Sequence, residues 1–274
     1  MASAGVPVSA PDWTGPYRDR AVVLRTYRLA EADRIIVLLG RDHGKIRGVA
    51  KGVRRTRSRF GARLEPASLV DISLWRGRGE LDTITGADSA GNVEQLTALR
   101  EDLVLLGRAM AMLEAVDRLT LERTPAPDLY DRLLRGLQSL VSHPSVLSVG
   151  AFLWRLAQLE GVAPDVERCV HCGAVAEFVA LDIAHGGLAC RRCRPPAAPA
   201  VDAETVTVLR EILGGRLADA LARPEGTAAE AVERLGVAVL EQHIERRLRV
   251  PPLLGPVGAA GGRSAEARGR RAHR

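Results

Sequence analysis

The sequence has few aromatic residues, almost no lysine and no long apolar run. Phe, Trp and Tyr make up 3% of the 274 residues, which disfavours a protein that stacks many nucleobases on aromatic platforms. Two of the 39 basic residues are lysine, and all the others are arginine. Because no run of eighteen apolar residues occurs, we expect no transmembrane helix. The first residues combine no basic segment with an apolar core, so we expect no secretion signal and a cytoplasmic protein.

Motifs of common catalytic sites are also missing. The sequence contains no G-x-x-x-x-G-K-[ST], no H-E-x-x-H and no G-x-S-x-G, which are typical of nucleotide-binding loops, zinc proteases and serine hydrolases. Acids of the N-terminal region such as Asp33, Asp71, Glu80 and Asp82 are scattered, without the spacing of paired metal-binding carboxylates. The sequence therefore indicates a binding protein and not an enzyme.

Positive charge is concentrated between Arg41 and Arg63. This stretch holds nine basic residues and one acid, a formal charge of +8, whereas the whole chain carries +6. Residues 263–274 add another +4, so the remaining residues sum to −6. Charge concentrated in this way predicts a polyanionic partner, of which nucleic acid is the commonest. A solvated arginine-rich loop is the alternative, but glycines and apolar residues interrupt the run in a strand-like rhythm.

Residues 18–90 have the pattern of a small β-barrel. Five short apolar or alternating stretches follow one another at hairpin spacing, at 20–27, 33–40, 44–53, 67–75 and 80–88. This strand count and length fit an OB-fold, a five-stranded barrel that often binds nucleic acid. Strict alternation in 44–53 would place Lys45, Arg47 and Lys51 on one face. Together with the loop that follows, they would form a single basic wall.

From residue 92 the apolar period becomes helical. Leucine, methionine and valine recur every three or four residues across 93–122, which predicts one long helix that ends before Pro125. Further helices are expected at 127–142, 145–161, 201–221 and 227–249. We expect residues 1–17 to be a disordered leader and 254–274 a disordered tail rich in Arg and Gly. The predicted class is α+β and multidomain, with an OB-fold barrel at 18–90 and an all-α domain at 91–253.

All four cysteines fall in one segment of the helical region. They are ordered Cys169-x2-Cys172, then seventeen residues, then Cys190-x2-Cys193. Two such pairs predict one structural Zn²⁺, because thiolates are ligands that zinc prefers and four of them fill its tetrahedral coordination. A hairpin between the pairs would bring them together, in a zinc module at 165–196. Disulfides and an iron–sulfur cluster are the alternatives, and the neighbouring His171 and His185 are expected not to be ligands.

The chain resembles a known family in several segments. Residues 22–66, VVLRTYRLAEADRIIVLLGRDHGKIRGVAKGVRRTRSRFGARLEP, the later cysteine pairs and the closing HIERRLR are similar to RecO, a family of bacterial recombination mediators and DNA repair proteins. The resemblance covers about residues 18–253. It implies an N-terminal OB-fold, a helical domain with the zinc module, and a cytoplasmic, nucleoid-associated protein. It also implies binding to single- and double-stranded DNA and annealing of complementary strands coated with the single-stranded DNA-binding protein SSB. The implied partners are RecR, SSB and, indirectly, RecF and RecA, which is loaded onto the strand.

We expect the DNA contacts to be the basic residues of the third predicted strand and the loop after it. These candidates are Lys45, Arg47, Lys51, Arg54, Arg55, Arg57 and Arg59. They are expected to neutralise phosphates without reading bases. Two other functions stay open: an RNA-binding factor with an OB-fold and zinc, and a zinc-containing DNA-processing enzyme. Scattered carboxylates and a fully ligated metal argue against the enzyme, but nothing in the composition separates RNA from DNA.

Overall fold

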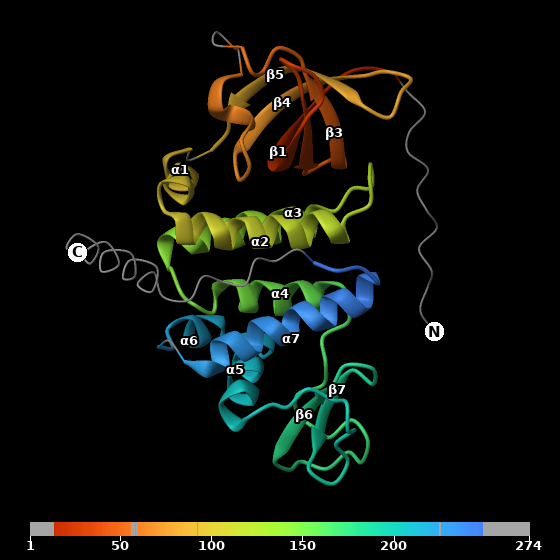
Figure 1. Cartoon of the computed structure of the whole chain (residues 1–274), viewed down its shortest axis with the longest axis vertical. Coiled ribbons are helices and arrows are strands. Elements are labelled where there is room, and N and C mark those ends of the chain that lie inside the picture. The colour runs from red at the N-terminus through yellow and green to blue at the C-terminus, as the bar shows by residue number, and fades with distance from the viewer. Residues whose placement is uncertain (1–13, 56–57, 59, 92, 225, 249–274) are drawn as a thin grey trace, which may run out of the picture.

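The structure is a computed structural model, and it describes residues 14–55, 58, 60–91, 93–224 and 226–248. A β-barrel lies at one end, layers of helices follow, and a small two-stranded module lies at the other end (Figure 1). Among the described residues, no helix is both long enough and apolar enough to cross a bilayer. The architecture confirms the predicted α+β class.

The N-terminal barrel is closed and five-stranded. Its order is β1-β2-β3-β5-β4, with β3 and β5 parallel and every other pair antiparallel. The strands are β1 (Gly15–Arg28), β2 (Arg34–Gly40), β3 (Gly44–Ala50), β4 (Leu69–Arg76) and β5 (Asp82–Ser89). The prediction of an OB-like barrel is confirmed.

The first strand begins earlier than the sequence pattern suggested. Gly15 pairs with Arg76, and Tyr17 pairs with Leu74 on β4. The expectation of a leader up to residue 17 is therefore wrong for residues 15–17, because cross-strand pairing extends β1 beyond its apolar run. Residues 1–13 and the predicted tail at 254–274 lie outside the described residues.

The barrel interior is filled by alternating residues and by a plug from the segment after β3. On β3, Ile46 and Ala50 point inward and are at most 2% exposed. Gly48 is also inward, and a Cβ there would lie 2.8 Å from Ile84, so this inner position needs glycine. Phe60, and Leu64 of the short 3-10 helix η1 (Gly61–Leu64), are buried in the same core. The basic loop between β3 and η1 is thus anchored at both ends.

The helical region contains α1 (Val93–Glu101), α2 (Leu103–Leu119), α3 (Pro127–Ser142), α4 (Ser148–Leu159), α5 (Ala203–Leu213), α6 (Leu217–Leu221) and α7 (Thr227–Ile244). The single long helix predicted over 93–122 is wrong. Asp102 is extended, and its Oδ1 accepts hydrogen bonds from the N–H groups of Val104 (2.7 Å) and Leu105 (3.0 Å), which caps a second helix. Leu103, which the apolar period placed in the core, is 77% exposed at this break. The helix predicted at 201–221 is also two helices, separated at Gly214 and Gly215.

One outer face of the barrel packs into the hydrophobic core of the helical domain. Val22 and Leu24 on β1, together with Val37 and Leu39 on β2, point out of the barrel and are almost fully buried against the helical cluster. Burial of this outer face fixes the barrel on the helical domain. It also leaves the opposite parts of the barrel surface open to a partner.

Candidate nucleic-acid interface and metal centre

The basic segment after β3 is held on the barrel by backbone contacts. The N–H of Gly52 donates to Oδ1 of Asp33 at 2.8 Å, and the N–H of Arg54 donates to the carbonyl of Ala32 at 3.1 Å. Gly52 has a φ of +67°, a left-handed conformation that glycine adopts without strain. These bonds turn the chain as it leaves the barrel and display the cations that follow.

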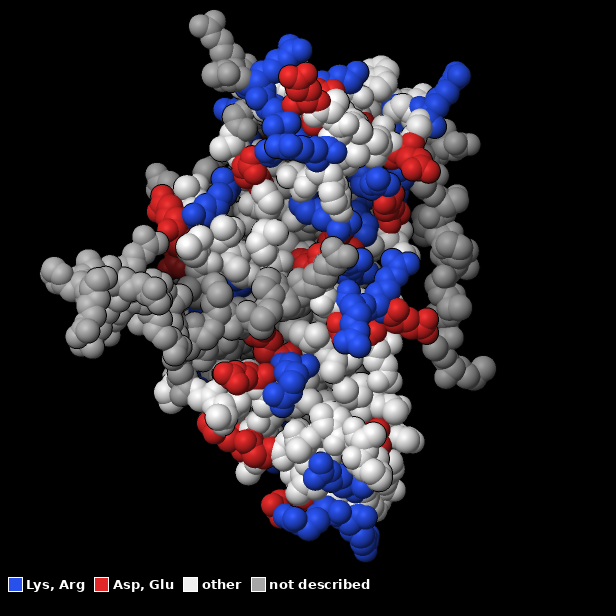
Figure 2. Space-filling model, viewed as in Figure 1, with Lys and Arg blue, Asp and Glu red and all other residues white. Residues whose placement is uncertain are grey.

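Three of the predicted DNA-contact residues are exposed on this segment. Lys51, Arg54 and Arg55 are all exposed to solvent. Nη1 of Arg54 also donates a hydrogen bond to the carbonyl of Glu31 at 2.8 Å. The sequence from Lys51 to Arg63 contains no acid, so nothing within the segment neutralises its charge. Figure 2 shows Lys and Arg side chains gathered over the barrel, and again at the tip of the cysteine module. Arg57 and Arg59 lie outside the described residues.

Lys45 and Arg47 lie elsewhere, and the prediction of a single basic wall is wrong. Alternation on β3 does turn both side chains outward, but that part of the barrel surface faces the helical domain. The Lys45 side chain is 13% exposed and lies 3.4 Å from Oδ1 of Asp117 at the end of α2. Arg47 lies 3.5 Å from Glu122. The barrel therefore directs these two cations toward carboxylates of the same chain.

Several ion pairs between the barrel and the helical domain were not predicted from the sequence. Asp117 is 3% exposed, and its Oδ2 lies 3.0 Å from Nε of Arg25 on β1. Arg123, in the loop after α2, lies 3.3 Å from Asp82 on β5, which is 2% exposed. Buried carboxylates require such partners, but residues this far apart in the chain give no local pattern. These ion pairs orient the barrel on the helices.

The four cysteines come together as the spacing predicted. A hairpin of β6 (Phe178–Asp182) and β7 (Gly187–Cys190) brings the second pair beside the first. The four sulfur atoms all lie within 4.8 Å of one another, and the Sγ atoms of Cys172 and Cys190 are 3.9 Å apart. The N–H of Cys190 points to Sγ of Cys169 at 3.5 Å. Four soft ligands at these separations fit one tetrahedral ion and leave no open coordination position.

The electrostatics of the cluster also favour a cation. Burial raises the pKa of the Cys169 thiol, but backbone N–H groups of Cys190, Cys172 and His171 outweigh it and bring the pKa to about 6. Hydrogen bonds with Cys190 and Cys172, together with burial, raise the pKa of Cys193 to about 12. Four thiolates cannot coexist at such short distances unless a metal ion compensates their charge.

The two histidines of the segment contact a carboxylate instead of the sulfur cluster. Oδ2 of Asp182 lies 2.8 Å from Nε2 of His171 and 2.9 Å from Nδ1 of His185. Burial raises the pKa of Asp182, but hydrogen bonds from His171 and His185 prevail and hold it below its ordinary value. Asp182 thus ties the knuckle of the first cysteine pair to the hairpin of the second.

Comparison with known proteins agrees with this architecture. The family described as Recombination protein O N terminal matches residues 15–93, which contain the barrel, and Recombination protein O C terminal matches residues 100–252. The DNA repair protein RecO of Cutibacterium acnes is 40% identical over an alignment 248 residues long, which covers 87% of this chain and 98% of that protein. The DNA repair protein RecO of Frankia casuarinae is 42% identical over 246 residues, with the same coverage. With both family models matched in order and relatives at about 40% identity over most of the chain, the chain belongs to the RecO family of DNA repair proteins.

Proposed function

We propose that this protein is a recombination mediator that binds single- and double-stranded DNA and anneals complementary strands, including strands coated with SSB. By its family membership, it would act with RecR and RecF to help load RecA. The observation that carries the proposal is the anchored, acid-free basic segment on the barrel, with Lys51, Arg54 and Arg55 exposed. Arg57 and Arg59 extend this set by sequence alone.

Charge on the phosphates would dominate the interaction. Arg54 and Arg55 are exposed on this segment, and Arg suits phosphate because its planar fork can donate two parallel hydrogen bonds. Contacts to phosphates carry no sequence information by themselves. Neutralising two strands also lowers their mutual repulsion, which accounts for annealing without a nucleotide cofactor.

The cysteine module would support this role as a structural element. Cys169, Cys172, Cys190 and Cys193 would hold one Zn²⁺ in a closed site, and that ion would tie the hairpin to the first knuckle. A fully ligated metal offers no position for an activated water, so the module gives no support to a DNA-processing enzyme. We therefore propose a binding protein without catalytic activity.

The proposal is tested by annealing of complementary single strands coated beforehand with SSB. Duplex formation is followed with and without the protein, without ATP, and at rising salt. We expect faster annealing at sub-stoichiometric protein and suppression of this effect by salt, because screening weakens phosphate contacts.

The other outcomes separate the parts of the proposal. Faster annealing of naked strands alone would retain DNA binding and contradict the action on coated strands. No effect on either substrate, with tighter binding to RNA than to DNA of the same sequence, would favour an RNA-binding factor. Magnesium-dependent nicking of the DNA by the wild-type protein would overturn the non-catalytic role.

A further inference from the structure

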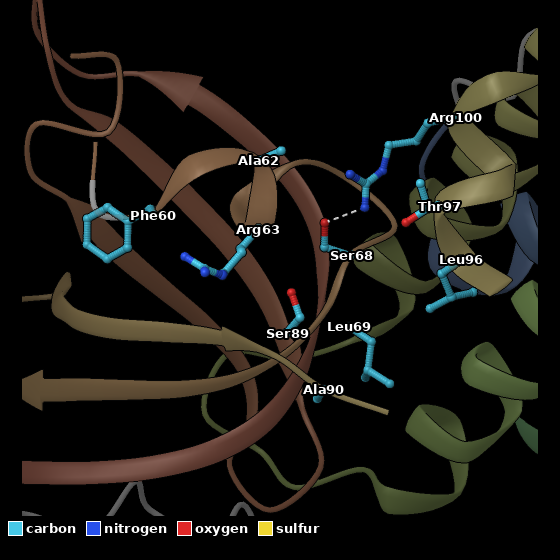
Figure 3. Close-up of a pocket in the computed structure, with 10 residues that line it drawn as sticks. All are labelled: Phe60, Ala62, Arg63, Ser68, Leu69, Ser89, Ala90, Leu96, Thr97 and Arg100. Carbon is cyan, nitrogen blue, oxygen red and sulfur yellow. Dashed lines mark hydrogen bonds between the residues drawn. The ribbon is translucent and has the colours of Figure 1, made fainter. Parts of the chain in front are cut away.

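A cavity of about 380 Å³ lies where the barrel meets α1. Its walls come from η1, the start of β4, the end of β5 and α1, four elements that follow one another in the chain (Figure 3). Arg63, at the end of η1, is the last residue of the basic segment. One residue of the proposed DNA-binding segment therefore also lines the cavity.

The polar groups of the cavity suit an anion. Arg63 and Arg100 both line it, hydroxyl groups accompany them, and none of the described residues that line it is acidic. Nη2 of Arg100 donates to Oγ of Ser68 at 2.7 Å, which holds this guanidinium at the cavity. In Figure 3, the Arg63 and Arg100 guanidinium groups lie on either side of Ser68. Two guanidinium groups and nearby hydroxyls are the chemistry that phosphate oxygens require.

The rest of the lining is apolar. Leu69 of β4 and Leu96 of α1 lie together on one side of the cavity (Figure 3). A simple inorganic anion would gain nothing from these side chains. A ligand with a charged group and a flat, weakly polar group would contact both parts, and a nucleotide has this composition.

We propose that this cavity binds one nucleotide of a bound single strand, with its phosphate on Arg63 and Arg100 and its base against Leu69 and Leu96. The inference rests on the proposed function and adds a binding site to it. In a duplex, base pairing and stacking withhold the base from such a cavity. The cavity therefore favours single strands over duplexes, which the exposed basic loop by itself does not.

The test uses fluorescence anisotropy with labelled (dT)20, a duplex of equal length and an abasic single strand. The variants are Arg63→Ala, Arg100→Ala and the double substitution. Arg191→Ala is the matched control, since it removes one exposed arginine from the distant cysteine module. Each cavity substitution should weaken (dT)20 binding about tenfold, and the loss of one phosphate contact should make the salt slope shallower by about 0.7. The duplex affinity should change much less.

The contact between the base and the apolar side of the cavity is tested separately. Wild-type protein should bind (dT)20 more tightly than the abasic strand, and Leu96→Ala should reduce that difference. Arg100 also bonds Ser68, so unfolding is measured for each variant, and Arg63→Ala tests the anion site without that bond. If the double variant binds (dT)20 as tightly as Arg191→Ala, the assignment of a nucleotide site to this cavity is wrong. If wild-type protein binds no DNA at all, the proposed function itself fails.

Discussion

Nζ of Lys45 on β3 donates a 2.7 Å hydrogen bond to the backbone carbonyl of Asp117 at the end of α2. The same ammonium group lies 3.4 Å from the Asp117 carboxylate, and the Lys45 side chain is 13% exposed. One of the two lysines of the chain therefore joins the barrel to the helical domain. Its sequence context, inside the most basic stretch, suggests a DNA contact, but its surroundings indicate a structural role.

Lys45 and Lys51 should accordingly respond differently to substitution. Lys45→Ala removes a charged hydrogen bond and one of the two cations near a buried carboxylate, so we expect about 2 kcal/mol lower free energy of unfolding. Lys51 is exposed, and Lys51→Ala should change stability by less than about 0.5 kcal/mol while weakening DNA binding. Urea unfolding and DNA anisotropy, run on both variants, measure the two effects.

The comparison has a clear contrary result. Equal losses of DNA affinity in Lys45→Ala and Lys51→Ala, with unchanged unfolding, would mean that Lys45 leaves Asp117 to contact DNA. Asp117→Asn is the matched control, because it weakens the same junction from the helical side. It should lower stability and leave DNA affinity near that of the wild type.

The arginines of the basic segment should act through charge alone. If about six residues of the basic segment contact phosphates, the single-strand binding constant should fall with salt at a log–log slope of about −4. Replacing Arg54, Arg55 and Arg57 by alanine should reduce this slope to about −2 and weaken binding to unrelated sequences equally. Salt titrations on three unrelated oligonucleotides measure both quantities. A loss confined to one sequence would contradict phosphate recognition, and Arg168→Ala in the cysteine module serves as the remote control.

The fold was largely predictable from the sequence because its signals are local. The alternation of apolar and charged residues predicted β3. Ile46 and Ala50 lie inside the barrel, and Lys45 and Arg47 lie outside it. Proline placed the start of α3 at Pro127. The break at Asp102 was missed because apolar residues continue at helical spacing through it, and a capping side chain can end one helix and begin another within such a run.

The candidate site was predictable in part, for a related reason. The cysteine cluster depends on two short motifs, so Cys169, Cys172, Cys190 and Cys193 could be assigned from their spacing alone. The basic wall depends on what covers the barrel, and residues such as Asp117 come from a helix seventy residues away. The cavity of Arg63 and Arg100 likewise depends on how η1, β4, β5 and α1 pack against one another. Long-range packing leaves no periodic trace in the sequence, so local patterns could predict neither feature.

The stability of the helical domain should depend on pH through Glu233 of α7. Burial raises the pKa of this carboxyl to about 7, against the opposing charge of Arg108. The backbone of α7 packs closely on α4 at this point, since a Cβ on Gly150 would lie 3.2 Å from the Glu233 backbone nitrogen. The folded-state pKa exceeds the ordinary value, so ionisation disfavours the fold above pH 7. Stability should therefore rise as the pH falls from about 7 toward the ordinary pKa of a glutamate.

Glu233→Gln isolates this effect. The variant should be more stable than wild type at pH 8 and nearly equal to it at pH 5, as measured by thermal unfolding in both buffers. Glu101→Gln, at an exposed position of α1, is the control for a change of net charge, because Glu230 itself contributes to the raised pKa of Glu233. A stabilisation of equal size at both pH values would show that ionisation of Glu233 is not its source.

Metal removal should affect the cysteine module first. Cys190→Ser replaces one of four clustered sulfur ligands, so we expect the metal content to fall from about one zinc ion per chain to less, with a lower Tm. Metal analysis and calorimetry on protein purified without added zinc measure both. His185→Gln is the matched control, since His185 contacts Asp182 and not the sulfur cluster, and it should keep the full metal content.

Because the barrel has its own buried core, amide exchange in β1 to β5 of Cys190→Ser should stay close to that of the wild type, whereas β6 and β7 exchange faster. An unchanged metal content and Tm in Cys190→Ser would contradict a structural site of four thiolates, and loss of metal in His185→Gln would make that histidine a ligand.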